Sequence, residues 1–332
     1  MTQASTGQID DASWRRHPDS PVLKSGNSGE WDEEHLAPSS VFLLDGTYHL
    51  FYAGSDGSAW RIGIATSTDL TNWTKHPANP VLDVGDPGAW DDQIVHEPVV
   101  TKIDDTYHMI YRGQDGKVDQ FGHATSADLI DWTRNEQNPV LGVGEPGAWD
   151  DTHIFGGELL RENGDYYLFY TGYSEPNVWP RSPLATIKSI YRSVFLNEQP
   201  SYRIGIANSI DLGSWTKDSS NPVFEPSDSK SWDSVDVSRP SIIRIADHYY
   251  LFYDGRGQGD HQIGYATSED LLSWNRGSKN PVLEPGETGR WDSRDVRSPV
   301  AIQSDDKIFL LYRGDDGDTQ QIGLAHARIG SR

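Results

Sequence analysis

The chain has 332 residues, a length that fits one large domain or two ordinary ones. It contains no cysteine, which excludes disulfides, thiolate metal sites and a cysteine nucleophile. Its 50 acidic residues outnumber 28 basic ones and give a formal net charge of -22. We therefore expect no nucleic acid partner, because binding to phosphate backbones needs clustered Lys and Arg.

The acidic residues are spread along the whole chain, and Arg outnumbers Lys among the basic residues. A dispersed acidic coat with little Lys is typical of a halophilic protein, because salt screens the repulsion between carboxylates. An ordinary acidic protein is the alternative. No apolar run approaches the roughly 18 residues of a membrane helix, and the Arg15-Arg16 pair lacks the apolar stretch of a signal. We expect a cytoplasmic protein that binds no membrane.

Two tryptophan registers repeat along the chain with spacings of 59, 59, 83 and 59 residues. The first register follows an Asp-Leu turn or a similar turn and consists of Trp14, Trp73, Trp132, Trp215 and Trp274. The second register is a Trp-Asp pair and consists of Trp31, Trp90, Trp149, Trp232 and Trp291. The long spacing indicates an insertion in the third repeat. We predict that the five repeats form a single domain, residues 1–332.

Within each repeat, a Pro-led apolar segment precedes a Tyr-rich segment and an Ile-Gly segment. The Tyr-rich segments are YHLFYAG, YHMIYRG, YYLFYTG, YYLFYDG and IFLLYRG. Such short aromatic and β-branched segments, separated by Asp-Gly, Asn-Gly and Asn-Pro turns, predict four antiparallel strands per repeat. Four-stranded sheets bury both faces when they stack around an axis, so we predict an all-β, five-bladed β-propeller. The chain begins with an outer-strand element, and this N-terminal strand is predicted to close the last blade.

The Trp-Asp pairs and the Asn-Pro elements recur in nearly every repeat, including repeats that cannot all meet one ligand. We predict structural roles for them, with Trp packed between blades and Asp bound to loop amides. Function is expected where the repeats differ.

The segments that follow the Trp-Asp pairs differ most between repeats. They read EEHLAP (33–38), DQIVHEP (92–98), DTHIFGGE (151–158), SVDVSRP (234–240) and SRDVRSP (293–299). In a propeller these segments converge around the axis on one face. They supply Glu33, Glu34, His35, His96, Glu97, His153, Glu158, Asp236, Arg239, Asp295 and Arg297.

Glycoside cleavage needs two carboxyl groups, one protonated and one ionised, roughly 5 to 9.5 Å apart. Glu97 is the strongest candidate for a catalytic carboxylate, and Glu34 and Glu158 compete to be its partner. The alternative role for each is a loop cap or a salt bridge.

The remaining polar residues of these segments are candidates for substrate binding. Arg239 and Arg297 could hold sugar hydroxyls, a carboxylate or a phosphate, and their alternative is internal pairing with Asp236 and Asp295. The histidines His35, His96 and His153 are expected to contact substrate. They could also gather around a metal, but three His on three loops is a weak signal. We expect no metal and no cofactor.

The insertion spans residues 173–202 and carries the one strongly cationic stretch of the chain. Apolar residues from Leu184 to Val194 recur at helical spacing within it. One interpretation is a lid in which Trp179 or Tyr191 stacks on the substrate. The other is a contact between subunits of an oligomer.

The repeats, particularly GYATSEDLLSWNRGSKNPVLEPG with YYLFYDG, resemble the five-bladed propeller glycosidases of families 43, 32 and 68, and 130. In furanosidase-type members a catalytic Asp precedes Pro in the first blade, where this chain has Ala37-Pro38. Their acid Glu begins the inner strand of the third blade, and Glu158 is displaced from that place by a residue or more. The His96-Glu97-Pro98 segment is similar to the Glu-Asp-Pro of family 130, whose Asp is the acid, and this implies the same role for Glu97.

Three functions remain open at this point. The first is a glycoside hydrolase that acts on a small sugar or oligosaccharide. The second is a phosphorylase like those of family 130, which would use Arg239 or Arg297 for phosphate and needs one protein carboxylate. The third is a non-catalytic sugar-binding propeller, suggested by Ala37, although the divergent inner segments favour one composite site over five equivalent ones.

Overall fold

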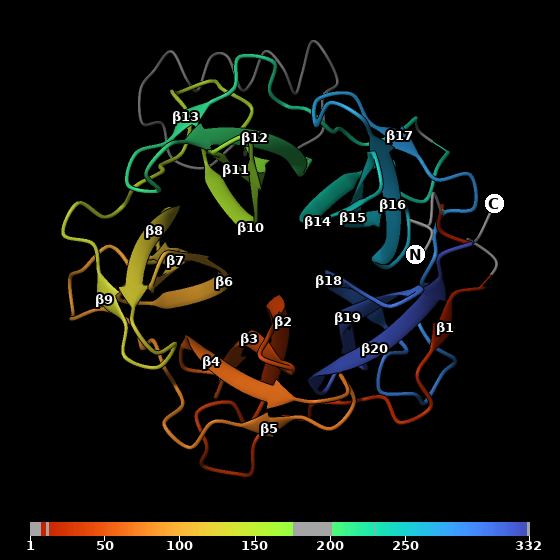
Figure 1. The fold of residues 1–332 in the computed structure, drawn as a ribbon, viewed down its shortest axis with the longest axis horizontal. Helices are drawn as coiled ribbons and strands as arrows, with labels where there is room; N and C mark the ends of the chain where they lie inside the picture. Colours follow the sequence, from red (N-terminus) through yellow and green to blue (C-terminus); the bar gives the residue numbers. More distant parts are fainter. Residues whose placement is uncertain (1–7, 11–12, 175–200, 229, 331–332) are drawn as a thin grey trace.

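The computed structural model describes residues 8–10, 13–174, 201–228 and 230–330. In these residues the regular structure is all-β, as predicted, and consists of five antiparallel groups with one repeated pattern. The first strands of the groups lie innermost around a common centre (Figure 1). They are β2 (His35–Leu44), β6 (Ile94–Ile103), β10 (His153–Glu162), β14 (Asp236–Ile245) and β18 (Asp295–Ser304).

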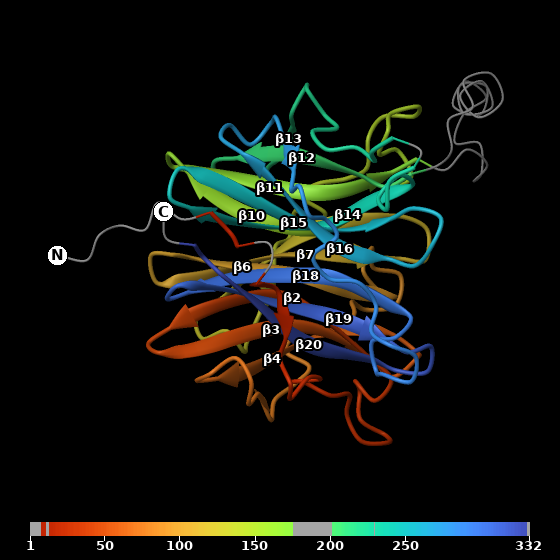
Figure 2. The same cartoon turned by 90° about the vertical axis from the view of Figure 1, so that its right-hand side faces the viewer.

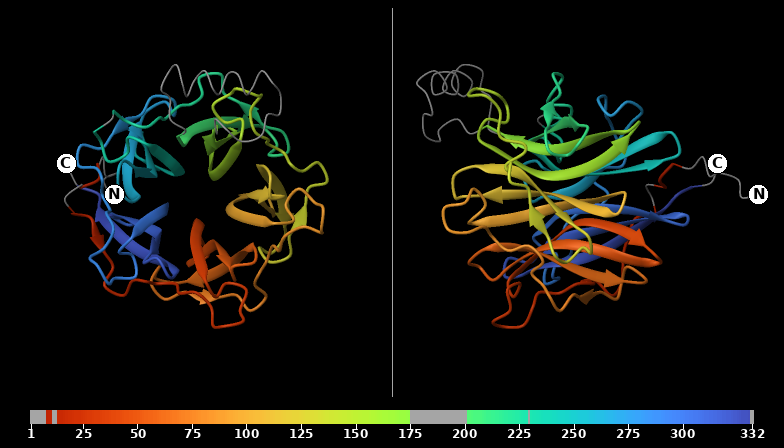
Figure 3. Two further views of the ribbon diagram at one scale, coloured as in Figure 1. Left: turned by 180° about the vertical axis from the view of Figure 1, so that it is seen from behind. Right: turned by 60° about the vertical axis from the view of Figure 1, so that its left-hand side comes forward.

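Each inner strand pairs with a neighbour from the Tyr-rich segment, and that neighbour pairs with a strand from the Ile-Gly segment. The second strands are β3 (Thr47–Ser55), β7 (Thr106–Gln114), β11 (Asp165–Tyr173), β15 (His248–Arg256) and β19 (Lys307–Asp315). The third strands are β4 (Trp60–Ser67), β8 (Asp119–Ser126), β12 (Arg203–Ser209), β16 (Gln262–Ser268) and β20 (Gln320–Arg328). The inner strands keep their central place when the molecule is seen from behind (Figure 3).

Short outer strands complete the groups. They are β5 (Thr74–Lys75), β9 (Thr133–Arg134), β13 (Thr216–Lys217), β17 (Asn275–Arg276) and β1 (Arg15–Arg16). The first four follow directly on their own group, whereas β1 pairs with β20, so that Arg15 lies opposite His326. The N-terminal strand therefore joins the last group, as the chain order predicted.

Parallel bridges link neighbouring groups at the starts of their strands. One bridge joins His35 to Gln320, and another joins Trp60 to Ile94. These bridges merge three groups into one 12-stranded sheet, while the other two groups remain four-stranded sheets. Figure 2 shows the edge-on arrangement, with β18–β20 (blue) beside β2–β4 (red to orange).

The hydrophobic core is divided into clusters that lie between consecutive groups. Phe51 of β3 packs in one cluster with Met109 of β7. Another cluster contains Leu324 of β20 and Leu50 of β3, so the last group also packs against the first. Because each sheet buries its faces only against its neighbours, all five groups depend on one another for stability.

The second tryptophan register packs flat against the strands of its own group. Trp31 stacks on Tyr52 with ring centroids 5.7 Å apart. A Cβ atom on Gly54 or Gly63 would come within 2.7 or 2.8 Å of the Trp31 ring. These repeated glycines are therefore needed because the indole lies directly on the backbone.

The aspartate of each Trp-Asp pair joins the second strand to the outer strand. Asp91 accepts hydrogen bonds from the Tyr111 hydroxyl at 3.0 Å and from Arg134 Nε at 2.9 Å. The same arrangement recurs in the other groups, and in the last one Arg16 of β1 supplies the cation. The framework role predicted for these aspartates agrees with this geometry, although these hydrogen bonds come from side chains rather than from loop amides.

Among the described residues, no helix has the length and the apolar character that a membrane span requires.

Candidate active site

Four of the five inner strands begin with a bulge whose first residue has positive φ. These residues are Glu97 (φ 50°), Gly156 (φ 57°), Arg239 (φ 50°) and Ser298 (φ 51°). Such a backbone is unfavourable for residues other than glycine, and clusters of it mark functional sites. In the first group the register shift lies between Pro38 and Ser40, so Pro38 rather than Ala37 takes the place of Glu97.

Glu97 lies at the centre of a polar network. Its Oε2 accepts a hydrogen bond from the backbone N–H of Gly156 at 2.7 Å, and its Oε1 accepts one from Arg239 Nε at 3.2 Å. Arg112 Nη1 lies 3.8 Å from Oε2, and His96 Nδ1 lies 3.9 Å from Oε1. The carboxylate is buried and accepts hydrogen bonds from two other inner strands, β10 and β14.

Burial alone would raise the pKa of Glu97. Electrostatic interactions with His96, Arg112 and Arg239 and the hydrogen bond from the Gly156 N–H outweigh burial, so the pKa of Glu97 lies below its usual range. Burial lowers the pKa of His96 to about 3, which leaves this imidazole neutral near pH 7. The protein thus presents an ionised carboxylate next to a neutral histidine.

Arg239 joins Glu97 to a second carboxylate that sequence analysis did not identify. Its Nη1 lies 3.5 Å from Asp254 Oδ2, and its backbone N–H donates to Thr171 Oγ1 at 2.9 Å. Asp254 also accepts hydrogen bonds from the Ser238 hydroxyl at 2.9 Å and the Ser298 N–H at 3.3 Å. The pairing of Arg239 with Asp236 that was considered above is wrong, because the bulge aims Arg239 at Glu97 and Asp254.

Asp236 and Asp295 bind groups near the starts of their own strands. Asp236 pairs with Arg256 and accepts the Tyr202 N–H at 3.0 Å. Asp295 pairs with Arg297 and accepts the His261 N–H at 2.8 Å. The internal pairing considered for Arg297 is therefore present in the structure.

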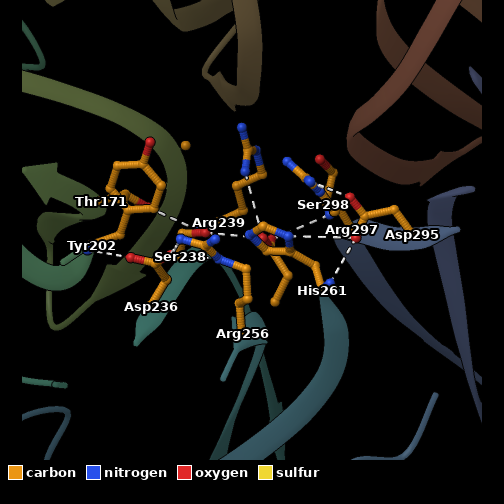
Figure 4. A network of polar contacts seen from close by, with 12 residues as sticks. Thr171, Tyr202, Asp236, Ser238, Arg239, Arg256, His261, Asp295, Arg297 and Ser298 are labelled. Carbon is orange, nitrogen blue, oxygen red and sulfur yellow. Dashed lines mark hydrogen bonds and ion pairs between the residues drawn. The ribbon is translucent and has the colours of Figure 1, made fainter. Parts of the chain in front are cut away.

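Buried polar atoms without hydrogen-bond partners gather between the last two groups. Among the described residues they include His261 Nε2, Ser298 Oγ, Arg297 Nε and Arg313 Nε. Figure 4 shows Arg239, His261, Arg297 and Ser298 converging from β14, β18 and the start of β16. His261, Ser298 and Arg313 are each less than 9% exposed.

Arg313 belongs to a cluster with Arg239 and Arg297, which we call the arginine cluster. Burial, together with the charges of Arg239 and Arg297, lowers the pKa of Arg313 to about 10 against the opposing effect of Asp254 and Asp295. A buried cation that is destabilised in this way favours an anion as a partner. The site therefore combines an ionised carboxylate with donors suited to bind a phosphate or carboxylate group.

Glu158 and Glu34 have partners other than Glu97. Glu158 directly follows the Gly156-Gly157 bulge, where its Oε2 accepts a hydrogen bond from the Ser241 hydroxyl at 3.0 Å. Burial raises the pKa of Glu158 to about 7. Glu34 is half exposed on the rim, with Oε2 3.6 Å from His35 Nε2.

Two of the three predicted histidines, His35 and His96, contact the same indole, and His153 lies apart from them. His153 Nδ1 lies 2.7 Å from Asp119, which in turn binds Arg112 at 2.6 Å. His35 stacks on Trp60, and Trp60 contacts His96. Among the described residues, no group of three His, Asp or Glu side chains has the geometry of a metal site. Trp179 lies outside the described residues, as does most of the insertion, which connects β11 to β12.

Several residues of the network were missed because they lie in the Tyr-rich segments. The residue between Tyr and Gly in these segments is Ala53, Arg112, Thr171, Asp254 or Arg313, and each lies opposite an inner-strand residue in front of the bulge. The letters of YAG, YRG, YTG and YDG differ only there. The rule that function lies where repeats differ would have found them in the second strand as well.

Known carbohydrate-active enzymes are similar to this chain in sequence and in fold. The sequence model of glycoside hydrolase family 130, described as beta-1,4-mannooligosaccharide phosphorylase, matches residues 184–328 of this chain. A 1,2-beta-oligomannan phosphorylase of Thermoanaerobacter sp. (strain X514) is 25% identical over 325 residues, covering 91% of this chain and 94% of the relative.

Solved structures are similar over nearly the whole chain. A glycosyl hydrolase from Bacteroides ovatus has a TM-score of 0.71 at 19% identity, and the match covers 99% of this chain and 99% of the hydrolase. Another similar structure comes from work on family 130 of mannoside phosphorylases. That family contains glycoside hydrolases that target beta-1,2 mannosidic linkages in Candida mannan. The structure has a TM-score of 0.68 at 18% identity, and the match covers 98% of this chain and 95% of that chain. The likeness shows an all-β propeller-type fold, and the predicted resemblance to the propeller glycoside hydrolases is confirmed.

Proposed function

We propose that the protein is a β-mannoside phosphorylase, and that its five strand groups are the blades of one propeller domain with the site at their centre. The matching family model and the Thermoanaerobacter relative both carry the names of mannoside phosphorylases. These names indicate a β-mannoside as the substrate, and the positive charges of the site favour phosphorolysis as the reaction.

The arginine cluster is the observation that carries this proposal. Arg239, Arg297 and Arg313 interact electrostatically, and Arg313 Nε is buried without a hydrogen-bond partner among the described residues. Phosphate can accept several hydrogen bonds and neutralise more than one arginine, which suits it to such a cluster. The cluster adjoins Glu97 through Arg239, so a bound phosphate would lie near the catalytic carboxylate.

In the proposed reaction an oxygen of phosphate attacks the anomeric carbon of the mannosyl unit. The bond from that carbon to the glycosidic oxygen breaks, and the electron pair leaves with the oxygen. This oxygen takes a proton from Glu97, which regains one from solvent. The products are mannose 1-phosphate and the shortened sugar.

Phosphate binding would also prepare Glu97 to hold that proton. The cations that surround Glu97 keep its pKa low in the free protein. A phosphate on Arg239 would compensate their charge and place a negative group nearby, and both effects raise the pKa of a carboxylic acid. Binding of the second substrate would thereby convert Glu97 from a base into an acid.

Hydrolysis is the second candidate, since a similar structure comes from work on hydrolases within the same family. A hydrolase needs a second carboxylate that can activate water. Asp254 shares Arg239 with Glu97 but is fully buried, and Glu34 and Glu158 have other partners. The contacts of the site therefore favour phosphate over activated water.

Initial rates on β-1,2- and β-1,4-mannobiose, with and without inorganic phosphate, test the proposal. We expect turnover only when phosphate is present, with a rate that saturates as phosphate rises. Equal turnover in phosphate-free buffer would favour the hydrolase, and no turnover of either sugar would reject a mannoside substrate.

A further inference from the structure

We infer that Trp60 is the platform on which the sugar ring stacks, an inference that rests on the proposed function. Trp60 begins β4, and its equivalents in the other groups are Asp119, Tyr202, His261 and Gln320. Each of these residues lies three positions before the glycine of an Ile-Gly segment. This position thus carries a different residue in every group, and in the first group it is a tryptophan that contacts His96 beside Glu97.

The equivalent positions in three other groups make polar links to the next inner strand. Asp119 contacts His153, the Tyr202 N–H binds Asp236, and the His261 N–H binds Asp295. In the first group the facing residue is Ile94, which offers no polar side chain. The indole at position 60 therefore does not replace the polar link that its equivalents make.

Trp60 instead contacts two histidine rings. The His35 ring stacks on it with centroids 5.8 Å apart and planes at 20°, and the His96 ring lies 4.5 Å away at 57°. The indole is half-buried, which leaves part of it accessible. Nδ1 of His35 and Nδ1 of His96 are buried and have no hydrogen-bond partner among the described residues.

This arrangement suits a pyranose ring. The C–H face of a sugar packs on a flat aromatic surface, while the hydroxyls around its edge need polar partners. The histidines contact the indole and can supply those partners. His96 is neutral near pH 7, so its two ring nitrogens provide one donor and one acceptor.

The platform and the arginine cluster both adjoin Glu97. His96 Nδ1 is 3.9 Å from Glu97 Oε1, and Arg239 Nε is 3.2 Å from the same oxygen. Trp60, His35 and His96 come from the first two groups, whereas Arg297 and Arg313 come from the last. A sugar on Trp60 would thus present its anomeric carbon to Glu97, with phosphate approaching from the arginine side.

Replacement of Trp60 tests this assignment. In Trp60→Ala, we expect the KM for mannobiose to rise about tenfold or more, which corresponds to about 1.4 kcal/mol. The KM for phosphate should stay within about twofold, because the arginine cluster is untouched. Trp60→Phe keeps a flat ring and should raise the KM for mannobiose much less than Trp60→Ala does. The control Trp73→Phe alters a framework tryptophan whose Nε1 binds the Leu70 carbonyl, and should leave both KM values unchanged.

Two further measurements keep the outcomes distinct. Trp60→Leu fills the space without a flat face, so it replaces the alanine variant if thermal melting shows that variant to be unfolded. Calorimetry with mannobiose in phosphate-free buffer measures sugar binding alone. Equal affinity in wild type and in the folded Trp60 variants would overturn the role of Trp60. Absence of binding in the wild type would overturn the proposed function itself, and the inference with it.

Discussion

Arg239 donates a hydrogen bond to Glu97 across 142 residues of sequence, with Nε 3.2 Å from Oε1. Both residues stand at the bulge of an inner strand, and both have a φ of 50°. A bulge turns the side chain at its first residue away from the regular alternation of the strand. The strained backbone thus aims a cation and an anion at each other near the centre of the molecule.

Substitution of the carboxylate tests its role in turnover. In Glu97→Gln the amide can still accept the Gly156 N–H but cannot donate a proton as an acid, so kcat should fall by about 10² to 10⁴. Mannobiose binding, measured by calorimetry, should persist. The control Glu136→Gln changes an exposed glutamate in an outer turn and should keep full turnover. Unchanged kcat in Glu97→Gln would remove Glu97 from the mechanism.

Arg313 is expected to serve phosphate binding at a cost to stability. In Arg313→Met a buried cation is replaced by an apolar side chain of similar length, so melting without phosphate should stay unchanged or rise. Phosphate should raise the melting temperature of the wild type, because a ligand stabilises the state that binds it, and this rise should be lost in the variant. An equal rise in both proteins would place phosphate elsewhere.

Glu158 should make stability depend on pH. Burial raises its folded pKa from 4.5 to about 7, so the folded state holds a proton that the unfolded state releases. The stability due to neutral Glu158 is present below pH 4.5 and is lost as pH rises through about 7. The loss is at most about 3 kcal/mol.

Urea unfolding at pH 5 and pH 8 measures this effect as a difference between wild type and Glu158→Gln. The wild type should lose more stability than the variant over this interval, because the glutamine carries no titrating proton. Parallel changes in the two proteins would show that Glu158 does not titrate in this range.

The Trp-Asp framework should govern stability rather than chemistry. In Asp91→Ala the Tyr111 hydroxyl and the Arg134 guanidinium lose their shared acceptor, and the free energy of unfolding should fall by about 3 to 5 kcal/mol. Tyr111→Phe removes the hydrogen bond to Asp91 and the one accepted from Asn138 Nδ2 at 3.3 Å, and should cost about 1 to 2 kcal/mol. Chemical denaturation checks both values, and the kcat of the folded Tyr111→Phe variant should match the wild type. A large loss of kcat there would contradict a purely structural role.

The sequence was sufficient to predict the framework because its elements are local and repeated. The Trp-Asp pairs and the Tyr-rich segments recur at a fixed period, and each forms its contacts inside one group or with the next. The role of the N-terminal strand followed from the order of these elements along the chain.

The partners within the site could not be predicted in the same way. Pairing with Asp236, three residues earlier, was the alternative considered for Arg239, but the bulge directs it to Glu97 and Asp254 on other strands. Glu158 was a candidate for the catalytic partner of Glu97, yet the Gly156-Gly157 bulge places it farther along β10, beside Ser241. A sequence pattern does not show where a bulge falls, and a shift of one residue changes the face that a side chain occupies.

Cleavage of mannobiose in oxygen-18 water is the most direct test of the central claim, which is that phosphate rather than water attacks the anomeric carbon. The wild type should convert mannobiose and unlabelled phosphate into mannose 1-phosphate without oxygen-18 at the anomeric carbon, as read by mass spectrometry. Free mannose that carries oxygen-18 at that carbon, formed at the same rate with or without phosphate, would contradict the account, because water would then be the attacking group.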